Sequence, residues 1–187
     1  MAFLARPAQR YAKAYFSRSM NISYPKLVFA ALLTLYFLWI AFDPMQGSFL
    51  DMVDLPIHET GHLIFGIFGE FIGMAGGTLF QLILPAVFVG YFWWNEKYFS
   101  AAIVLFWVGQ SVINVHVYAQ DAVRMELPLV GGGIHDWNWM LTNLGLLDST
   151  KVIAGLIRVI GALTIVAASV TSIFYAFHSP ERELEEI

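Results

Sequence analysis

The sequence predicts an all-α protein, a polytopic integral membrane bundle of about five transmembrane helices with room for one re-entrant segment. Apolar residues make up 58% of its 187 residues and charged residues 13%, against about 45–50% and about 25% in soluble domains. A chain of this size cannot bury so much apolar surface in a water-facing fold. The apolar residues also fall into long runs without period-2 alternation, which argues against strands.

Five apolar runs are the expected crossings, judged against the roughly 20 residues that a transmembrane helix needs. They cover residues 27–42, 55–74, 78–94, 99–119 and 152–177. Breaks fall at Asp43-Pro44, Gly76-Gly77, the 95–97 turn and Pro180. The first and third runs are short enough to cross tilted or only in part.

Charge divides the chain into three parts. We expect a basic amphipathic segment over 1–23, the transmembrane domain over 24–178 and an acidic tail over 179–187. Residues 1–26 hold five of the ten Lys and Arg and no acid, which places the N-terminus in the cytoplasm by the positive-inside rule. Five crossings would then put the tail on the opposite face. The expected location is a bacterial inner (cytoplasmic) membrane.

Composition also excludes several classes of function. A soluble enzyme and a nucleic-acid binder do not fit so apolar a chain, so no nucleic-acid partner is expected and membrane lipids are. Cysteine is absent, which excludes disulfides, thiolate metal sites and cysteine nucleophiles.

One motif carries chemistry, His58-Glu59-Thr60-Gly61-His62, inside an otherwise apolar run. On a helix the two histidines are one turn apart and point the same way. Two imidazoles at that spacing can bind one Zn²⁺, and Glu59 can act as general base on a zinc-activated water. Ionisable residues are costly inside a membrane and normally signal function there. The alternative is a chance occurrence of the motif.

A zinc site needs a third protein ligand. We favour His135, because the three glycines before it let the backbone approach a site closely, although it could instead cap a helix. Asp136 is the next candidate, as a ligand or as the partner of an imidazole. Asp121 and His116, near the end of the fourth run, are further candidates.

The expected topology conflicts with this ligand set. Five full crossings would place His58 and His135 on opposite sides of a hydrocarbon core about 30 Å thick. Either the second helix starts deep, after a re-entrant approach through residues 51–56, or residues 131–147 fold back into the bundle. Irregular backbone is allowed at that depth where protein covers it. Gln81, in the third run, could line a cavity there.

The motif resembles that of the intramembrane zinc metalloproteases of the site-2 protease class and their M50-like relatives. The resemblance implies Glu59 as catalytic base and His58 and His62 as zinc ligands. That family takes its third ligand, an aspartate, from an Asn-Pro-x-x-Asp-Gly pattern, which this sequence lacks. The combination of the motif with residues 131–137 also resembles uncharacterised bacterial membrane proteins.

Two functions follow as hypotheses. The first is a membrane-embedded zinc-dependent metalloprotease or hydrolase, acting on a transmembrane peptide or a lipid amide. The second is a non-catalytic subunit of a larger membrane protein complex, whose histidines bind a structural metal, a pigment or nothing. A transporter is a third reading, which the lack of an inverted repeat disfavours.

Overall fold

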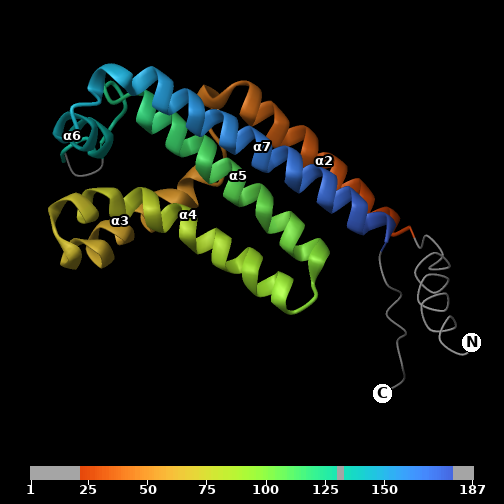
Figure 1. Ribbon diagram of the computed structural model, residues 1–187. Helices are drawn as coiled ribbons and strands as arrows, with labels where there is room; N and C mark the ends of the chain where they lie inside the picture. Colours follow the sequence, from red (N-terminus) through yellow and green to blue (C-terminus); the bar gives the residue numbers. More distant parts are fainter. Residues whose placement is uncertain (1–21, 130–132, 179–187) are drawn as a thin grey trace, which may run out of the picture.

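The computed structural model describes residues 22–129 and 133–178, and the predictions for 1–21 and 179–187 lie outside these residues. The described chain is all-helical, which confirms the fold class (Figure 1). Its elements are α2 (Tyr24–Phe42), η1 (Pro44–Gln46), α3 (Asp51–Phe65), η2 (Gly66–Phe68), α4 (Glu70–Trp94), α5 (Tyr98–Gln120), α6 (Asp136–Asn143), η4 (Leu147–Ser149) and α7 (Thr150–Phe177).

Four helices in the described residues are long and apolar enough to cross a membrane, so the chain has the character of a membrane protein. They are α2, α4, α5 and the stretch Leu147–Phe177 that contains α7. The second run, 55–74, is not a crossing. It divides between α3, which has only 15 residues, η2 and the start of α4. Gly69 makes the break at φ 105°, a conformation that costs glycine little.

α7 lies against both α2 and α5, and α4 packs on α5 (Figure 1). The core that α2, α5 and α7 share contains Phe37 of α2, stacked on Phe106 of α5 with ring centroids 5.2 Å apart. Ile165 of α7 is fully buried in the same core. This packing holds α5 rigidly, and α5 carries one wall of the site described below.

The four helices alternate in direction, so both described ends of the chain meet. The backbone N–H of Ser23 donates to Ala176 O at 3.0 Å, and Tyr98, after the α4–α5 turn, stacks on Tyr175. We call the end of the bundle that holds Ser23, Tyr98 and Ala176 the terminal end, and we call the opposite end the loop end. The expectation that five crossings separate the two termini is therefore corrected for the described helices: residues 22 and 178 lie at the same end (Figure 1).

The second helix, α3, starts deep in the bundle, which is one of the two arrangements that the sequence allowed. After α2 ends, the chain turns back along it, and Ser48 Oγ lies 3.2 Å from Tyr36 OH. α3 then begins level with the middle of α5, where Trp107 Nε1 donates to Asp54 Oδ1 at 2.8 Å and Gln110 Nε2 donates to Asp51 Oδ1 at 2.6 Å. From there α3 runs outward to the loop end.

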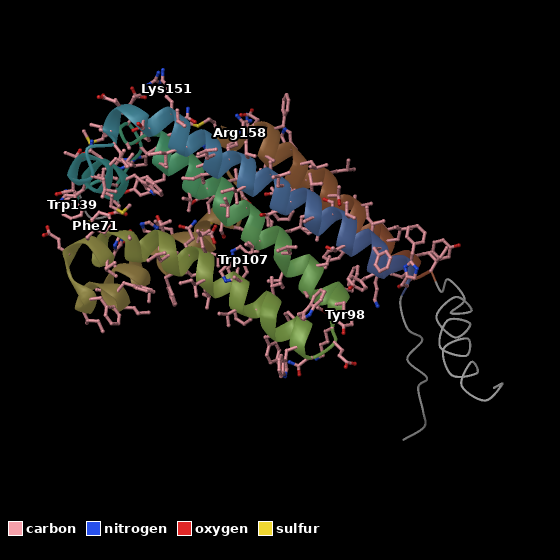
Figure 2. The ribbon with its side chains drawn as sticks, in the orientation of Figure 1. Phe71, Tyr98, Trp107, Trp139, Lys151 and Arg158 are labelled. Carbon is pink, nitrogen blue, oxygen red and sulfur yellow. The ribbon has the colours of Figure 1, made fainter. Side chains whose placement is uncertain are left out.

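The short helix α6 covers the loop end. The side-chain amide of Asn138 donates to Ala122 O, just after α5, at 2.8 Å. Figure 2 shows Trp139 of α6 beside Phe71 of α4, and their ring centroids are 5.9 Å apart. These contacts place the start of α6 over the face of α3 that carries the histidines.

Candidate metal centre

α3 lies unusually close to α4 because both helices carry glycine where they cross. A Cβ on Gly61 would collide with the backbone carbonyl of Gly76, and a Cβ on Gly76 would lie 2.6 Å from Gly61 O. Small residues at a helix crossing permit such an approach. One turn along, the same closeness brings the imidazoles of His58 and His62 against the backbone of Gly77.

Three ligand-type side chains converge there, from α3 and from the first turn of α6. His58 Nε2 lies 3.1 Å from His62 Nε2. Asp136 Oδ2 lies 2.9 Å from the first nitrogen and 3.2 Å from the second. His58 and Asp136 are buried and His62 is half-buried. The three residues form a group that could hold a metal ion.

In each imidazole, Nδ1 is the ring nitrogen that does not face the other two ligand atoms, and it has a polar partner of its own. His62 Nδ1 lies 2.8 Å from Gly73 O, and His58 Nδ1 lies 3.2 Å from Gln81 Oε1. A backbone carbonyl can only accept, so His62 carries its proton on Nδ1 in the neutral form. A histidine that donates one ring N–H to a carbonyl or carboxylate and offers the other nitrogen as a lone pair is in the usual state of a metal ligand.

Three atoms that can each serve as a metal ligand therefore face one another. Without a metal, the hydrogen bond to Asp136 raises the pKa of His62 to about 9. Burial opposes the ionisation of Asp136, but hydrogen bonds from His58 and His62 outweigh it and lower the pKa of its carboxyl. One proton on His62 can point at only one of its two neighbours, whereas one metal ion contacts all three.

The spacing fits a zinc ion closely. Zinc bonds of about 2.0–2.2 Å in a tetrahedral arrangement place neighbouring ligand atoms roughly 3.3–3.6 Å apart. The observed separations of 2.9, 3.1 and 3.2 Å need to widen by only a few tenths of an ångström. Three protein ligands leave the fourth position of a tetrahedron open, as in catalytic zinc sites.

Glu59 lies beside this group and faces a cavity of about 430 Å³. Its carboxylate is exposed and makes no hydrogen bond to any described residue. His58 and Tyr118 line the same cavity, and most of the remaining wall is apolar, from residues such as Leu55 and Val117. No Lys or Arg of the described chain lines it. Glu59 therefore presents a carboxylate without a hydrogen-bond partner among the described residues to the cavity that His58 also lines.

The structure corrects the order of preference for the third ligand. His135 does not join the group, because its ring nitrogens face elsewhere: Nδ1 accepts from Asn138 N at 3.3 Å, and Nε2 lies 3.4 Å from Asp121 Oδ2. It caps the start of α6, the structural role that its position before a helix also allowed. Asp136, one residue along, takes the place by the histidines.

His116 and Asp121 are likewise engaged away from the cluster. His116 Nδ1 lies 2.9 Å from Ala154 O of α7, so this ring is turned away from α3. The carboxylate of Asp121 accepts the backbone N–H groups of Glu126 and Leu127, each at 3.0 Å. Asp121 shapes the loop after α5 and lies beside His135.

Residues absent from the expected site help to build it. Gly77 and the carbonyl of Gly73 contact the imidazoles from α4. Tyr118 accepts the backbone N–H of Asp136 at 3.3 Å and stacks on His135, which orients the start of α6. Only a polar residue in an apolar run, such as Tyr118, gives a signal in the sequence. A backbone carbonyl gives none.

A second buried acid lies one turn before the motif. Asp54 is 1% exposed, and burial raises the pKa of its carboxyl to about 6, with hydrogen bonds from Trp107 and Gln110 acting in the opposite direction. It anchors the start of α3 in the middle of the bundle and does not contact the cluster.

Comparisons of this chain with protein-family models, with curated proteins and with solved structures return no match.

Proposed function

We propose that the protein is a membrane-embedded zinc-dependent hydrolase of the metalloprotease type, with His58, His62 and Asp136 as zinc ligands and Glu59 as general base. The observation that carries the proposal is the convergence of three ligand-type atoms, two of them on imidazoles whose Nδ1 atoms have polar partners of their own. When bound, zinc supplies a Lewis acid that polarises a carbonyl and lowers the pKa of water.

The chain's own residues would supply proton transfer and binding. Glu59 takes the proton of the attacking water and delivers it to the leaving nitrogen of an amide, a role that needs a free carboxylate at the site. The 430 Å³ cavity is within the range of small-ligand sites. Its apolar wall and its lack of basic side chains among the described residues favour an uncharged apolar substrate, a peptide segment or a lipid amide, over an anionic one.

Replacing Glu59 by glutamine should abolish turnover and leave the metal in place. Loss of a general base costs about 10²–10⁴-fold in rate, whereas the three ligands are untouched. The measurement is cleavage of a panel of quenched-fluorescent apolar peptides in detergent micelles, with zinc per chain determined on the same samples.

Two results would contradict the hydrolase proposal. One is equal turnover by the wild type and Glu59→Gln. The other is a wild type that binds zinc and cleaves no peptide or lipid amide. The second result, together with purification in a fixed ratio with other proteins, would favour the non-catalytic subunit of a membrane complex.

We also propose that the terminal end faces the cytoplasm of a bacterial cell and that the metal centre opens toward the other side. The support is the placement of basic residues: those at 1–26 directly precede or begin α2, and the positive-inside rule assigns such segments to the cytoplasm. On this proposal the loop end, with α3 and α6, faces the opposite side of the membrane.

Single-cysteine labelling tests this orientation without background, because the chain has no cysteine. Asn95 and Asp148 are exposed at the terminal end and the loop end respectively. In intact cells, an impermeant maleimide should label Asp148→Cys, and it should label Asn95→Cys only after permeabilisation. The reverse pattern would overturn the orientation.

A further inference from the structure

A chain of hydrogen-bonded side chains leads from His58 back to the start of its own helix. His58 Nδ1 lies 3.2 Å from Gln81 Oε1 of α4. Gln81 Nε2 donates to Asn114 Oδ1 of α5 at 2.8 Å. Asn114 Nδ2 donates to Asp51 Oδ1 of α3 at 3.1 Å. Gln81 is 2% exposed, so an unmet hydrogen bond would be costly at this point.

The direction of every bond in this chain is fixed by Asp51. A carboxylate only accepts, and Asp51 Oδ2 also takes the backbone N–H of Ser48 at 2.7 Å. Asn114 must therefore present its NH₂ to Asp51 and its oxygen to Gln81. Gln81 must present its NH₂ to Asn114 and its oxygen to His58. His58 then carries a proton on Nδ1, which leaves Nε2 as the ring nitrogen that a metal can take.

We infer that Asp51, Asn114 and Gln81 are positioning residues that set the tautomer of His58 and so make its Nε2 available as a metal ligand. The inference deepens the proposed function and rests on it for its purpose, because the tautomer matters only if a metal binds. None of the three residues touches the three ligand atoms. They act through His58 alone.

The neighbouring histidine shows why His58 needs such a chain. His62 donates to a backbone carbonyl, Gly73 O, which can never become a donor. His58 meets a side-chain amide, which presents either an oxygen or an NH₂ group according to its own neighbours. The chain removes this ambiguity. His62 is consequently an internal control whose tautomer does not depend on Asp51.

The isosteric variant Asp51→Asn is the sharpest test, because it should reverse the chain. Ser48 N–H still requires an oxygen at the Oδ2 position, so the new NH₂ takes the Oδ1 position, where it faces both Asn114 and Gln110. Gln110 has an Oε1 without a hydrogen-bond partner among the described residues, so its amide can turn over and accept from the new NH₂. Asn114 and then Gln81 turn over in response, and Gln81 presents NH₂ to His58. His58 is then left with a proton on Nε2, where the metal would bind.

The experiment measures zinc affinity of the full chain in detergent by competition with a chromophoric chelator. Loss of a partner that orients a ligand typically costs about 10–100-fold in metal affinity, which is the loss expected for Asp51→Asn and for Gln81→Leu. Asp54→Asn is the control: it removes an acid that is more deeply buried than Asp51 from the same helix, outside the chain, and should change the affinity by less than about threefold. Equal effects of Asp51→Asn and Asp54→Asn would overturn the inference.

Nitrogen-15 NMR of the histidine rings in metal-free protein separates this inference from the proposed function. The wild type should show His58 protonated at Nδ1, and Asp51→Asn should move that proton to Nε2 while His62 keeps its pattern. His58→Ala identifies the signal. An unchanged His58 tautomer in Asp51→Asn would overturn the positioning role even if zinc binds. A changed tautomer in a protein that binds no zinc would support the chain and contradict the proposed function.

Discussion

The Asp136→Ala variant is expected to lose zinc binding, with an affinity at least about 10³-fold below that of the wild type. The loss should exceed the 10–100-fold that outer partners contribute, because Asp136 Oδ2 is one of three atoms within 3.2 Å of each other. Without it, two neutral imidazoles remain to hold a divalent ion, and turnover should disappear with the metal. Chelator competition gives the affinity, and mass spectrometry gives zinc per chain.

The matched control is the neighbouring residue. His135→Ala should keep zinc affinity within a few-fold of the wild type, because both ring nitrogens of His135 face Asn138 and Asp121. Its cost should be the loss of a helix cap, about 1 kcal/mol of stability. Zinc lost in His135→Ala and kept in Asp136→Ala would show that the start of α6 is rotated so that His135, and not Asp136, faces α3.

The Gly77→Ala variant should also lose the metal, by addition of a single methyl group. A Cβ at this position would lie 2.5 Å from His58 Nε2 and 2.6 Å from His62 Nε2, the two nitrogens that would hold the ion. The imidazoles cannot retreat without breaking their bonds to Gln81 and to Gly73 O. We expect zinc affinity to fall by about 100-fold or more, the upper end of what displaced supporting contacts cost.

Gly90→Ala is the control for Gly77→Ala on the same helix. A Cβ there meets nothing within 4 Å, and both substitutions bring the same gain in helix propensity. Any effect of alanine on α4 alone should therefore appear equally in both variants. Equal zinc affinity in Gly77→Ala, Gly90→Ala and the wild type would mean that the histidine tips do not lie against α4.

The positions of the long helices could be read from the sequence because hydropathy records them directly. The division of the second run could not, because residues 66–69 are apolar or glycine and look continuous with their neighbours. α3 ends at Phe65, and the short helix η2 with Gly69 at φ 105° after it separates α3 from α4. This break changes the number of apolar helices long enough to cross a membrane from the expected five to four in the described residues, and so brings residue 178 to the same end of the bundle as residue 22.

The sequence predicts the two histidines of the candidate site but not which residue of α6 joins them. His58 and His62 belong to one helical turn, so their spacing alone places them together. The choice between His135 and Asp136 depends on the rotation of α6 about its first turn, which Tyr118 and Asn138 set through contacts with the residues at the helix start. Adjacent residues at a helix start point in different directions, and hydropathy carries no information about which one faces α3.

X-ray absorption spectroscopy at the zinc edge of the purified wild-type chain tests the central claim most directly. A site made of His58, His62 and Asp136 should give about one zinc per chain with four nitrogen or oxygen neighbours at about 2.0–2.2 Å and the scattering pattern of two imidazoles. Absence of zinc after reconstitution with the metal, or a zinc ion without imidazole neighbours, would contradict the account.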